Sequence, residues 1–108
     1  MVKVIVLLPR REDMSREEFE RYAREQHLPL VMKLPGLRRL VINRVLPDPN
    51  APPAAFEAVA EDWFDDMVAM QAAFASPAGQ AVAADAPNYL DVERLQILVV
   101  EETEVPLA

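Results

Sequence analysis

The chain contains one histidine, His27, and no cysteine. Histidine has an ordinary pKa near neutrality, so it is the natural side chain to accept and return protons. His27 lies near the end of an amphipathic segment, two residues before a proline. We take it as the candidate catalytic acid or base. The alternative is a structural histidine that bonds a backbone carbonyl at a helix end, where the helix dipole favours an imidazolium.

Several polar and aromatic side chains are candidates for a substrate site around His27. Tyr22 and Trp63 could line an aromatic pocket, although such residues are more often core or interface aromatics. Asn43 could orient a substrate oxygen. Asp62 could orient His27, as the aspartate does in a Ser-His-Asp triad, or it could lie at a strand end in solvent. These four residues are assigned as candidate substrate-binding residues.

The composition argues against several other kinds of site. With one histidine and no cysteine, a metal would need mixed carboxylate ligands, so we expect no metal site. The two glycines, Gly36 and Gly79, form no glycine-rich phosphate loop. Haem is not favoured, because the chain has a net charge of −7 and haem is anionic. We therefore expect no cofactor.

Charge and hydropathy also bear on location and partners. Lysine and arginine occur at most in pairs, which argues against nucleic-acid binding. The apolar run Val4–Leu8 is too short for a membrane span or the core of a signal peptide. The lack of cysteine fits a reducing compartment. We expect a cytoplasmic protein that contacts neither membrane nor nucleic acid.

The elements that must position these residues can be read from periodicity and turn signals. Ser15 and Glu18 form the pattern of a capping box, and Asp65 is the expected cap of a second helix. Pro29 should kink or end the first helix near His27. Pro35-Gly36 is a turn signal. The expected strands are 2–8, 37–46, 56–64 and 92–100, and the expected helical segments start at 16, 66 and 77.

The order β-α-β-β-α-β predicts an α+β, ferredoxin-like fold with a four-stranded antiparallel sheet and both helices on one face. We expect one domain over residues 1–101 and an acidic tail over 102–108. The first and last strands are apolar on both faces, and the helices can cover only one of these faces. A second copy of the chain could cover the other, with Val6 and Val99 as candidate contacts. The alternatives are that these two side chains face the helices, or that both strands are central and partly exposed.

Four segments of the chain resemble the EthD family of dimeric α+β barrel proteins. They are Tyr22-Ala23-Arg24-Glu25-Gln26-His27-Leu28-Pro29-Leu30-Val31, Leu34-Pro35-Gly36-Leu37, Glu57-Ala58-Val59-Ala60-Glu61-Asp62-Trp63-Phe64, and Ala84-Asp85 through Tyr89-Leu90-Asp91. The resemblance implies a two-fold homodimer whose sheets pack face to face. It also implies a pocket between sheet and helices near His27, and Tyr89 joins the candidate substrate-binding residues.

Two functions follow as hypotheses. The first is a cofactor-independent enzyme, an isomerase, cyclase or monooxygenase, that acts on a small aromatic or lactone-like compound with His27 as acid or base. The second is a non-catalytic protein that binds a hydrophobic metabolite or assists an oxidative degradation pathway. A polar pocket around His27 would favour the enzyme, whereas a dry pocket with His27 bonded to backbone would favour the binding protein.

Overall fold

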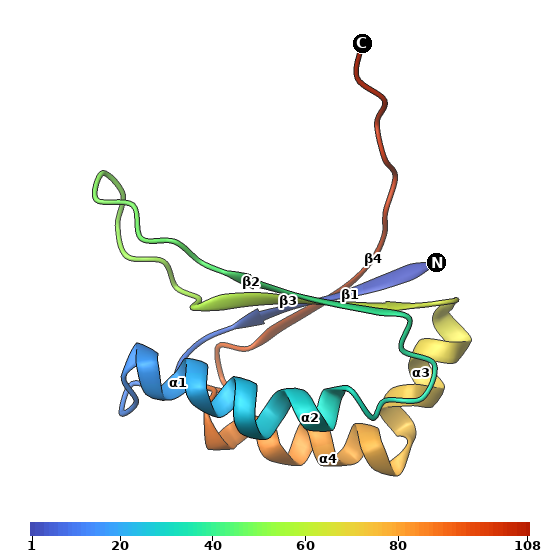
Figure 1. Cartoon of the computed structure of the whole chain (residues 1–108), viewed down its shortest axis with the longest axis horizontal. Coiled ribbons are helices and arrows are strands. Elements are labelled where there is room, and N and C mark those ends of the chain that lie inside the picture. The colour runs from blue at the N-terminus through green and yellow to red at the C-terminus, as the bar shows by residue number, and fades with distance from the viewer.

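A computed structural model describes all residues, 1–108, as one antiparallel sheet with the helices on one face (Figure 1). The strands are β1 (Val2–Leu8), β2 (Arg39–Arg44), β3 (Ala58–Phe64) and β4 (Gln96–Glu101). Their order in the sheet is β2-β3-β1-β4, with every neighbouring pair antiparallel. This arrangement confirms the predicted ferredoxin-like fold. It also places β4 at an edge, so the alternative in which the first and last strands are both central is wrong.

The helical layer contains six short elements. They are α1 (Arg16–Tyr22), η1 (Ala23–His27), α2 (Leu28–Val31), α3 (Met67–Ala75), α4 (Pro77–Asp85) and η2 (Ala86–Asn88). The predicted capping box is present: Ser15 Oγ accepts from the Glu18 amide, and the Glu18 carboxylate accepts from the Ser15 amide. The N-cap of α3 is Asp66 rather than the expected Asp65, whose carboxylate instead pairs with Arg38. None of these helices is long and apolar enough to cross a membrane.

The first helix does not end at His27, although an end there was one of the two outcomes expected from Pro29. It widens into the π-helical segment η1 and then continues as α2. The Leu28 amide donates to the Ala23 carbonyl, one residue farther back than in an α-helix. A proline lacks an amide donor and its ring crowds the preceding turn, and the wider segment lies in the turn directly before Pro29. Segments of this kind are frequent at functional sites.

The core lies between the helix-facing side of the sheet and the helices, in two clusters. One contains Val4, Val31, Leu34, Phe64, Met70 and Ala73. The other contains Leu8, Phe19, Ala58, Ala60, Tyr89 and Leu90. Asp62 lies on β3 between Ala60 and Phe64, one member of each cluster, and it faces the same side because side chains alternate along a strand. The strand thus brings a carboxyl group into the apolar layer.

The opposite face of the sheet has no helix over it (Figure 1). Val6 and Val99 contact the helix-side cavity described below, so the expectation that they lie on the open face is wrong. The strand register instead places Ile5 beside Leu98 on the open face, because each alternates along its strand with residues that face the helices. The β2–β3 connection and the tail after Glu101 both extend on this side, away from the helices (Figure 1).

Candidate functional site

His27 forms a side-chain pair with Asp85, a residue that the sequence reasoning did not assign to the site. Its Nδ1 lies 2.9 Å from Asp85 Oδ2, and both side chains are largely buried. η1 positions the histidine and the last turn of α4 positions the aspartate. The ring bonds a carboxylate and not a backbone carbonyl. The alternative in which His27 bonds a backbone carbonyl at a helix end is therefore wrong. Asp85 takes the orienting position that the sequence analysis offered to Asp62.

Two further side chains donate to Asp85. The Tyr22 hydroxyl donates to Oδ1 at 2.6 Å, and Asn88 Nδ2 donates to the same oxygen at 2.9 Å. The Tyr89 ring packs against His27, with 4.7 Å between ring centroids, and stacks on Tyr22 at 5.4 Å. The structure therefore brings together three of the predicted site residues, His27, Tyr22 and Tyr89, around the unpredicted Asp85.

The hydrogen bonds decide the charge of Asp85. Burial acts to raise the pKa of Asp85, but the bonds from Tyr22, Asn88 and His27 outweigh burial and hold the pKa below its ordinary value. Asp85 is thus a carboxylate at neutral pH and can only accept hydrogen bonds. The bond to Asp85 raises the pKa of the Tyr22 hydroxyl, and burial raises the pKa of Tyr89. Both tyrosines remain protonated at neutral pH.

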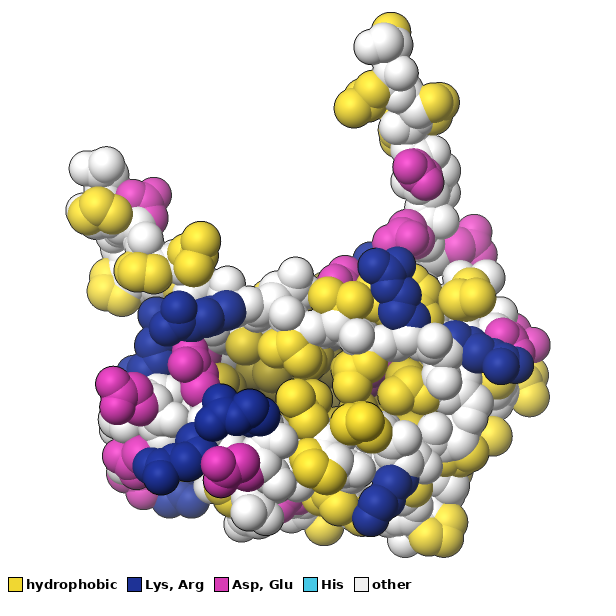
Figure 2. Space-filling model, in the orientation of Figure 1, with side chains coloured by type: hydrophobic (Ala, Val, Ile, Leu, Met, Phe, Trp, Pro, Cys, Tyr) yellow, Lys and Arg dark blue, Asp and Glu magenta, His cyan; other side chains and the backbone are white.

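His27 also lines a cavity of about 300 Å³ between the helix-facing side of the sheet and α4. Figure 2 shows a hollow bordered by hydrophobic side chains below the sheet on the viewed face. The walls come from Val4 and Val6 on β1, Ile97 and Val99 on β4, and residues of α3, α4 and the segment 86–95. Apart from His27 and Gly79, every lining residue is apolar. The cavity is the size of a small-molecule pocket.

Asp62 has no hydrogen bond to His27 and does not lie in solvent. Only 4% of the residue is exposed, and its Oδ1 has no hydrogen-bond partner. Burial raises the pKa of Asp62 to about 6. Asp62 does not line the cavity of His27. Both sequence alternatives for this residue, the orienting partner and the solvated strand end, are therefore wrong, because the strand register turns its side chain into the core.

Asn43 and Trp63 lie on the other face of the sheet. Trp63 is adjacent to Asp62 and therefore points to the opposite side, where Lys3 and Arg39 cover its ring at 5.0 and 4.5 Å from the centroid. Asn43 bonds Glu61 on that face. The expectation that Asn43 and Trp63 share a pocket with His27 is wrong, since a β-sheet separates them from it.

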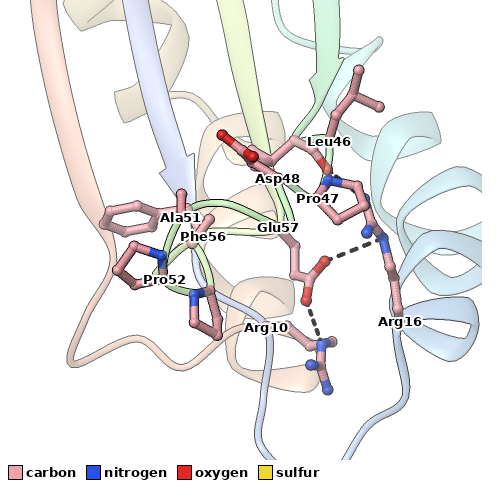
Figure 3. Close-up of a pocket in the computed structure, with 12 residues that line it drawn as sticks. Arg10, Arg16, Leu46, Pro47, Asp48, Ala51, Pro52, Phe56 and Glu57 are labelled. Carbon is pink, nitrogen blue, oxygen red and sulfur yellow. Dashed lines mark hydrogen bonds and ion pairs between the residues drawn. The ribbon is translucent and has the colours of Figure 1, made fainter.

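A second depression, of about 450 Å³, lies where the β2–β3 connection meets β1 and α1. Figure 3 shows the Glu57 carboxylate between Arg10 and Arg16, with Nε–Oε distances of 2.7 and 3.4 Å. Arg16 also pairs with Glu20, which in turn pairs with Arg44. Arg44 is exposed and joins this network through Glu20. This network fixes the base of the β2–β3 connection.

No group of three or more His, Cys, Asp or Glu side chains is arranged to hold a metal ion. The ionisable and hydroxyl groups that lie together around His27 are the imidazole, the Asp85 carboxylate and the two tyrosine hydroxyls. Of these, only the imidazole lies on the wall of the cavity. The arrangement can hold one imidazole, bonded at Nδ1 to Asp85, against a small apolar molecule.

Comparison with known proteins places the chain in a family. The EthD domain family model matches residues 11–93. An uncharacterised 11.0 kDa protein of Rhodococcus erythropolis, from the thcB–thcC intergenic region, is 32% identical over 88 residues, 82% of this chain and 84% of the relative. The crystal structure of an EthD family protein from Bacillus halodurans is 30% identical and has a TM-score of 0.83, covering 95% of this chain and 99% of that one.

More distant structures share the fold. A dimeric protein with a ferredoxin-like fold from Bacteroides fragilis has a TM-score of 0.68 at 16% identity, over 94% of this chain and 95% of its own. SnoaB from Streptomyces nogalater, a cofactor-independent oxygenase, has a TM-score of 0.67 at 17% identity, over 96% and 94%. The motif resemblance seen in the sequence is confirmed: the chain belongs to the EthD domain family.

Proposed function

We propose that this protein is a cofactor-independent enzyme that moves a proton on a small hydrophobic molecule, with His27 as acid or base and Asp85 as its positioning residue. One observation carries the proposal. The single histidine of the chain is the one ionisable side chain on an otherwise apolar cavity wall, and a carboxylate 2.9 Å away holds its Nδ1. Such a carboxylate fixes the tautomer of an imidazole and stabilises the imidazolium that forms during proton transfer.

The hydrogen bond to Asp85 determines which nitrogen can react. Because the carboxylate only accepts, Nδ1 carries the proton of the neutral imidazole. Nε2 makes no hydrogen bond within the chain and holds the lone pair. A substrate in the cavity would therefore lose a proton to Nε2 and later regain one from it.

This step is common to several reactions. When a C–H bond next to a carbonyl breaks, its electron pair forms an enolate and the proton passes to Nε2. Return of the proton at another carbon isomerises the substrate, and attack of the enolate on a second carbonyl closes a ring. SnoaB, which shares the fold, is a cofactor-independent oxygenase. The carbanion left when the proton passes to Nε2 could also react with molecular oxygen, which would be the external oxidant and the source of the new C–O bond. A small aromatic or lactone-like compound could be the substrate of all three reactions, namely isomerisation, ring closure and oxygenation.

We also propose that the working form is a homodimer assembled through the open face of the sheet. Ile5 and Leu98 lie side by side on that face with no helix over them, and Leu98 is half exposed. Exposed apolar faces of this kind usually mark interfaces. The dimeric state of the Bacteroides fragilis protein, which has the same fold, supports this assembly.

The catalytic role is tested by deuterium exchange into 2-tetralone, an uncharged ketone with acidic C–H bonds, followed by NMR in D₂O. The wild-type protein should accelerate exchange above the buffer rate. His27→Asn should reduce the protein-dependent rate by roughly 10²-fold or more, the usual effect of losing a general base. Asp85→Asn should also reduce it, because an amide no longer fixes the tautomer. Gln26→Asn, a change at the exposed neighbouring position, is the matched control and should leave exchange unchanged.

Equal rates for His27→Asn and the wild type would refute the acid–base role, provided that the variant has the circular dichroism spectrum and the sedimentation behaviour of the wild type.

The second candidate function is a non-catalytic protein that binds a hydrophobic metabolite. One observation favours it: the cavity wall carries no polar side chain besides His27 that could stabilise a developing oxyanion. Under this function the protein would bind uncharged ring compounds, and exchange in the presence of wild-type protein would equal the buffer rate.

A further inference from the structure

We infer that the His27 cavity selects an uncharged, mostly hydrocarbon molecule with one hydrogen-bond donor group, and that it excludes carboxylates and other anions. This inference rests on the proposed function for the identity of the site, and it adds the chemical class of the ligand. It follows from three features of the cavity: the lack of a lysine or arginine on its wall, the tautomer that Asp85 selects for the neutral His27 ring, and its volume.

The wall offers an anion no partner. Its lining contains no lysine and no arginine, and its only polar side chain is His27. Proteins that bind carboxylates in buried sites do so with arginine or lysine side chains or with clusters of backbone amides. These groups compensate the free energy that the carboxylate loses when it leaves water, and an apolar wall does not.

The nearest fixed charge is also negative. Asp85 lies directly behind the His27 ring, 2.9 Å from Nδ1, and hydrogen bonds from Tyr22 and Asn88 hold its carboxylate in place. The net charge of the whole chain, which includes Asp85, is −7. The arginines of the other depression, Arg10 and Arg16, are paired with Glu57 and do not line this cavity. An anionic ligand would thus meet repulsion without compensation.

In the neutral imidazole, the one polar side-chain atom available to a ligand is an acceptor. Asp85 accepts the Nδ1 proton, so Nε2 of the neutral ring presents a lone pair. A ligand with a hydroxyl, an N–H or an acidic C–H at that end completes the hydrogen bonding of the ring. A ligand that carries only an acceptor there, such as an ether, leaves Nε2 unpaired in an apolar site, which costs about 1–3 kcal/mol.

The cavity limits the size of the ligand. A volume of about 300 Å³ corresponds to about ten water molecules at their volume in the liquid. One aromatic ring with a short substituent, or two fused rings, fits this space. The remaining contacts would come from aliphatic and aromatic side chains such as Val6, Phe74 and Ile97.

The inference is tested with three probes of similar shape at pH 7: 4-ethylphenol, which is neutral and has a donor; 4-ethylanisole, which is neutral and has none; and 4-ethylbenzoate, which is ionised. Dissociation constants are measured by calorimetry on the full chain. The phenol should bind at least about 10-fold more tightly than the benzoate and several-fold more tightly than the anisole. Because His27 is the only histidine, one set of imidazole signals in the ¹⁵N NMR spectrum reports the contact. The phenol should shift the Nε2 signal and the anisole should not.

Ala83→Phe provides the matched control. Ala83 lines the cavity but is exposed, so a phenyl group there fills the space without displacing the buried core. This variant should bind none of the probes, and wild-type affinity in it would overturn the assignment of the site. Benzoate binding as tight as phenol binding, equal affinities for phenol and anisole, or no binding by any probe would also overturn the inference.

The outcomes separate this inference from the proposed function. If the probes bind in the expected order but exchange into 2-tetralone does not depend on His27, the ligand class stands and the catalytic role fails. If exchange depends on His27 but the benzoate binds best, the catalytic role stands and the ligand class fails.

Discussion

Asp62 should make this protein less stable as the pH rises through about 6. Only 4% of the residue is exposed and Oδ1 has no partner, so burial raises the pKa of the carboxyl group from 3.8 to about 6. Between these two values the folded state holds a proton that the unfolded state has released. The free energy of unfolding therefore falls as the pH increases. The stabilisation is complete below about pH 4 and is lost above the folded-state pKa.

The size of the effect follows from the same numbers. A pKa that rises from 3.8 to about 6 corresponds, at about 1.4 kcal/mol per pH unit, to about 3 kcal/mol of unfolding free energy. Other carboxylates, among them Asp85 and Glu61, have lowered pKa values and give the opposite slope, because their stabilisation is lost as the pH falls. The comparison of the wild type with Asp62→Asn at each pH removes these shared contributions.

The assay is urea denaturation followed by circular dichroism at pH values from 4 to 8. Asp62→Asn keeps the shape of the side chain but cannot ionise, so its stability relative to the wild type should improve by about 2 kcal/mol between the two ends of this range, the remainder being lost already below pH 4. Asp65→Asn is the control: Asp65 is exposed and paired with Arg38, which lowers its pKa, so its removal should not give a slope of this sign. A difference between Asp62→Asn and the wild type that does not change with pH would refute the reasoning.

Three further outcomes are expected. Gly79→Ala should destabilise the fold by about 1–3 kcal/mol in urea denaturation, because a Cβ there would lie 2.3 Å from a backbone carbonyl oxygen; a change below about 0.5 kcal/mol would contradict this. Leu98→Lys should raise the dimer dissociation constant at least about 10-fold in sedimentation, whereas Met67→Lys, at an exposed position on α3, should not. Tyr22→Phe removes a donor from Asp85 and should cost about 1–3 kcal/mol at neutral pH, with a smaller cost in acid, where Asp85 is protonated; an equal cost at both pH values would argue against an ionised Asp85.

The local signals in the sequence were sufficient to predict the helices and strands and to identify the family. The capping box at Ser15 and Glu18, the turn at Pro35-Gly36 and the Ser76-Pro77 helix start depend on residues close in the chain, and the structure contains all three. The order of strands and helices, together with the motif around His27, indicated the ferredoxin-like fold and the EthD family, which the comparisons confirm.

Some local features were still misjudged from sequence. Both Asp65 and Asp66 can cap a helix, and only the position of Arg38, which pairs with Asp65, distinguishes them. Pro29 signals a break in an α-helix, but the chain passes through the π-helical segment η1 and continues as α2.

The partners of the site side chains depended on tertiary structure alone. Asp85 is separated from His27 by 58 positions, and no local pattern distinguishes it from other aspartates near a helix end. The strand period placed Asp62 and Trp63 on opposite faces, but only the packing of the helices decided which face is the core. The sequence therefore determined which residue can carry a proton, whereas the fold decided what holds that residue and what lines the cavity beside it, since contacts between distant segments have no signature in local sequence.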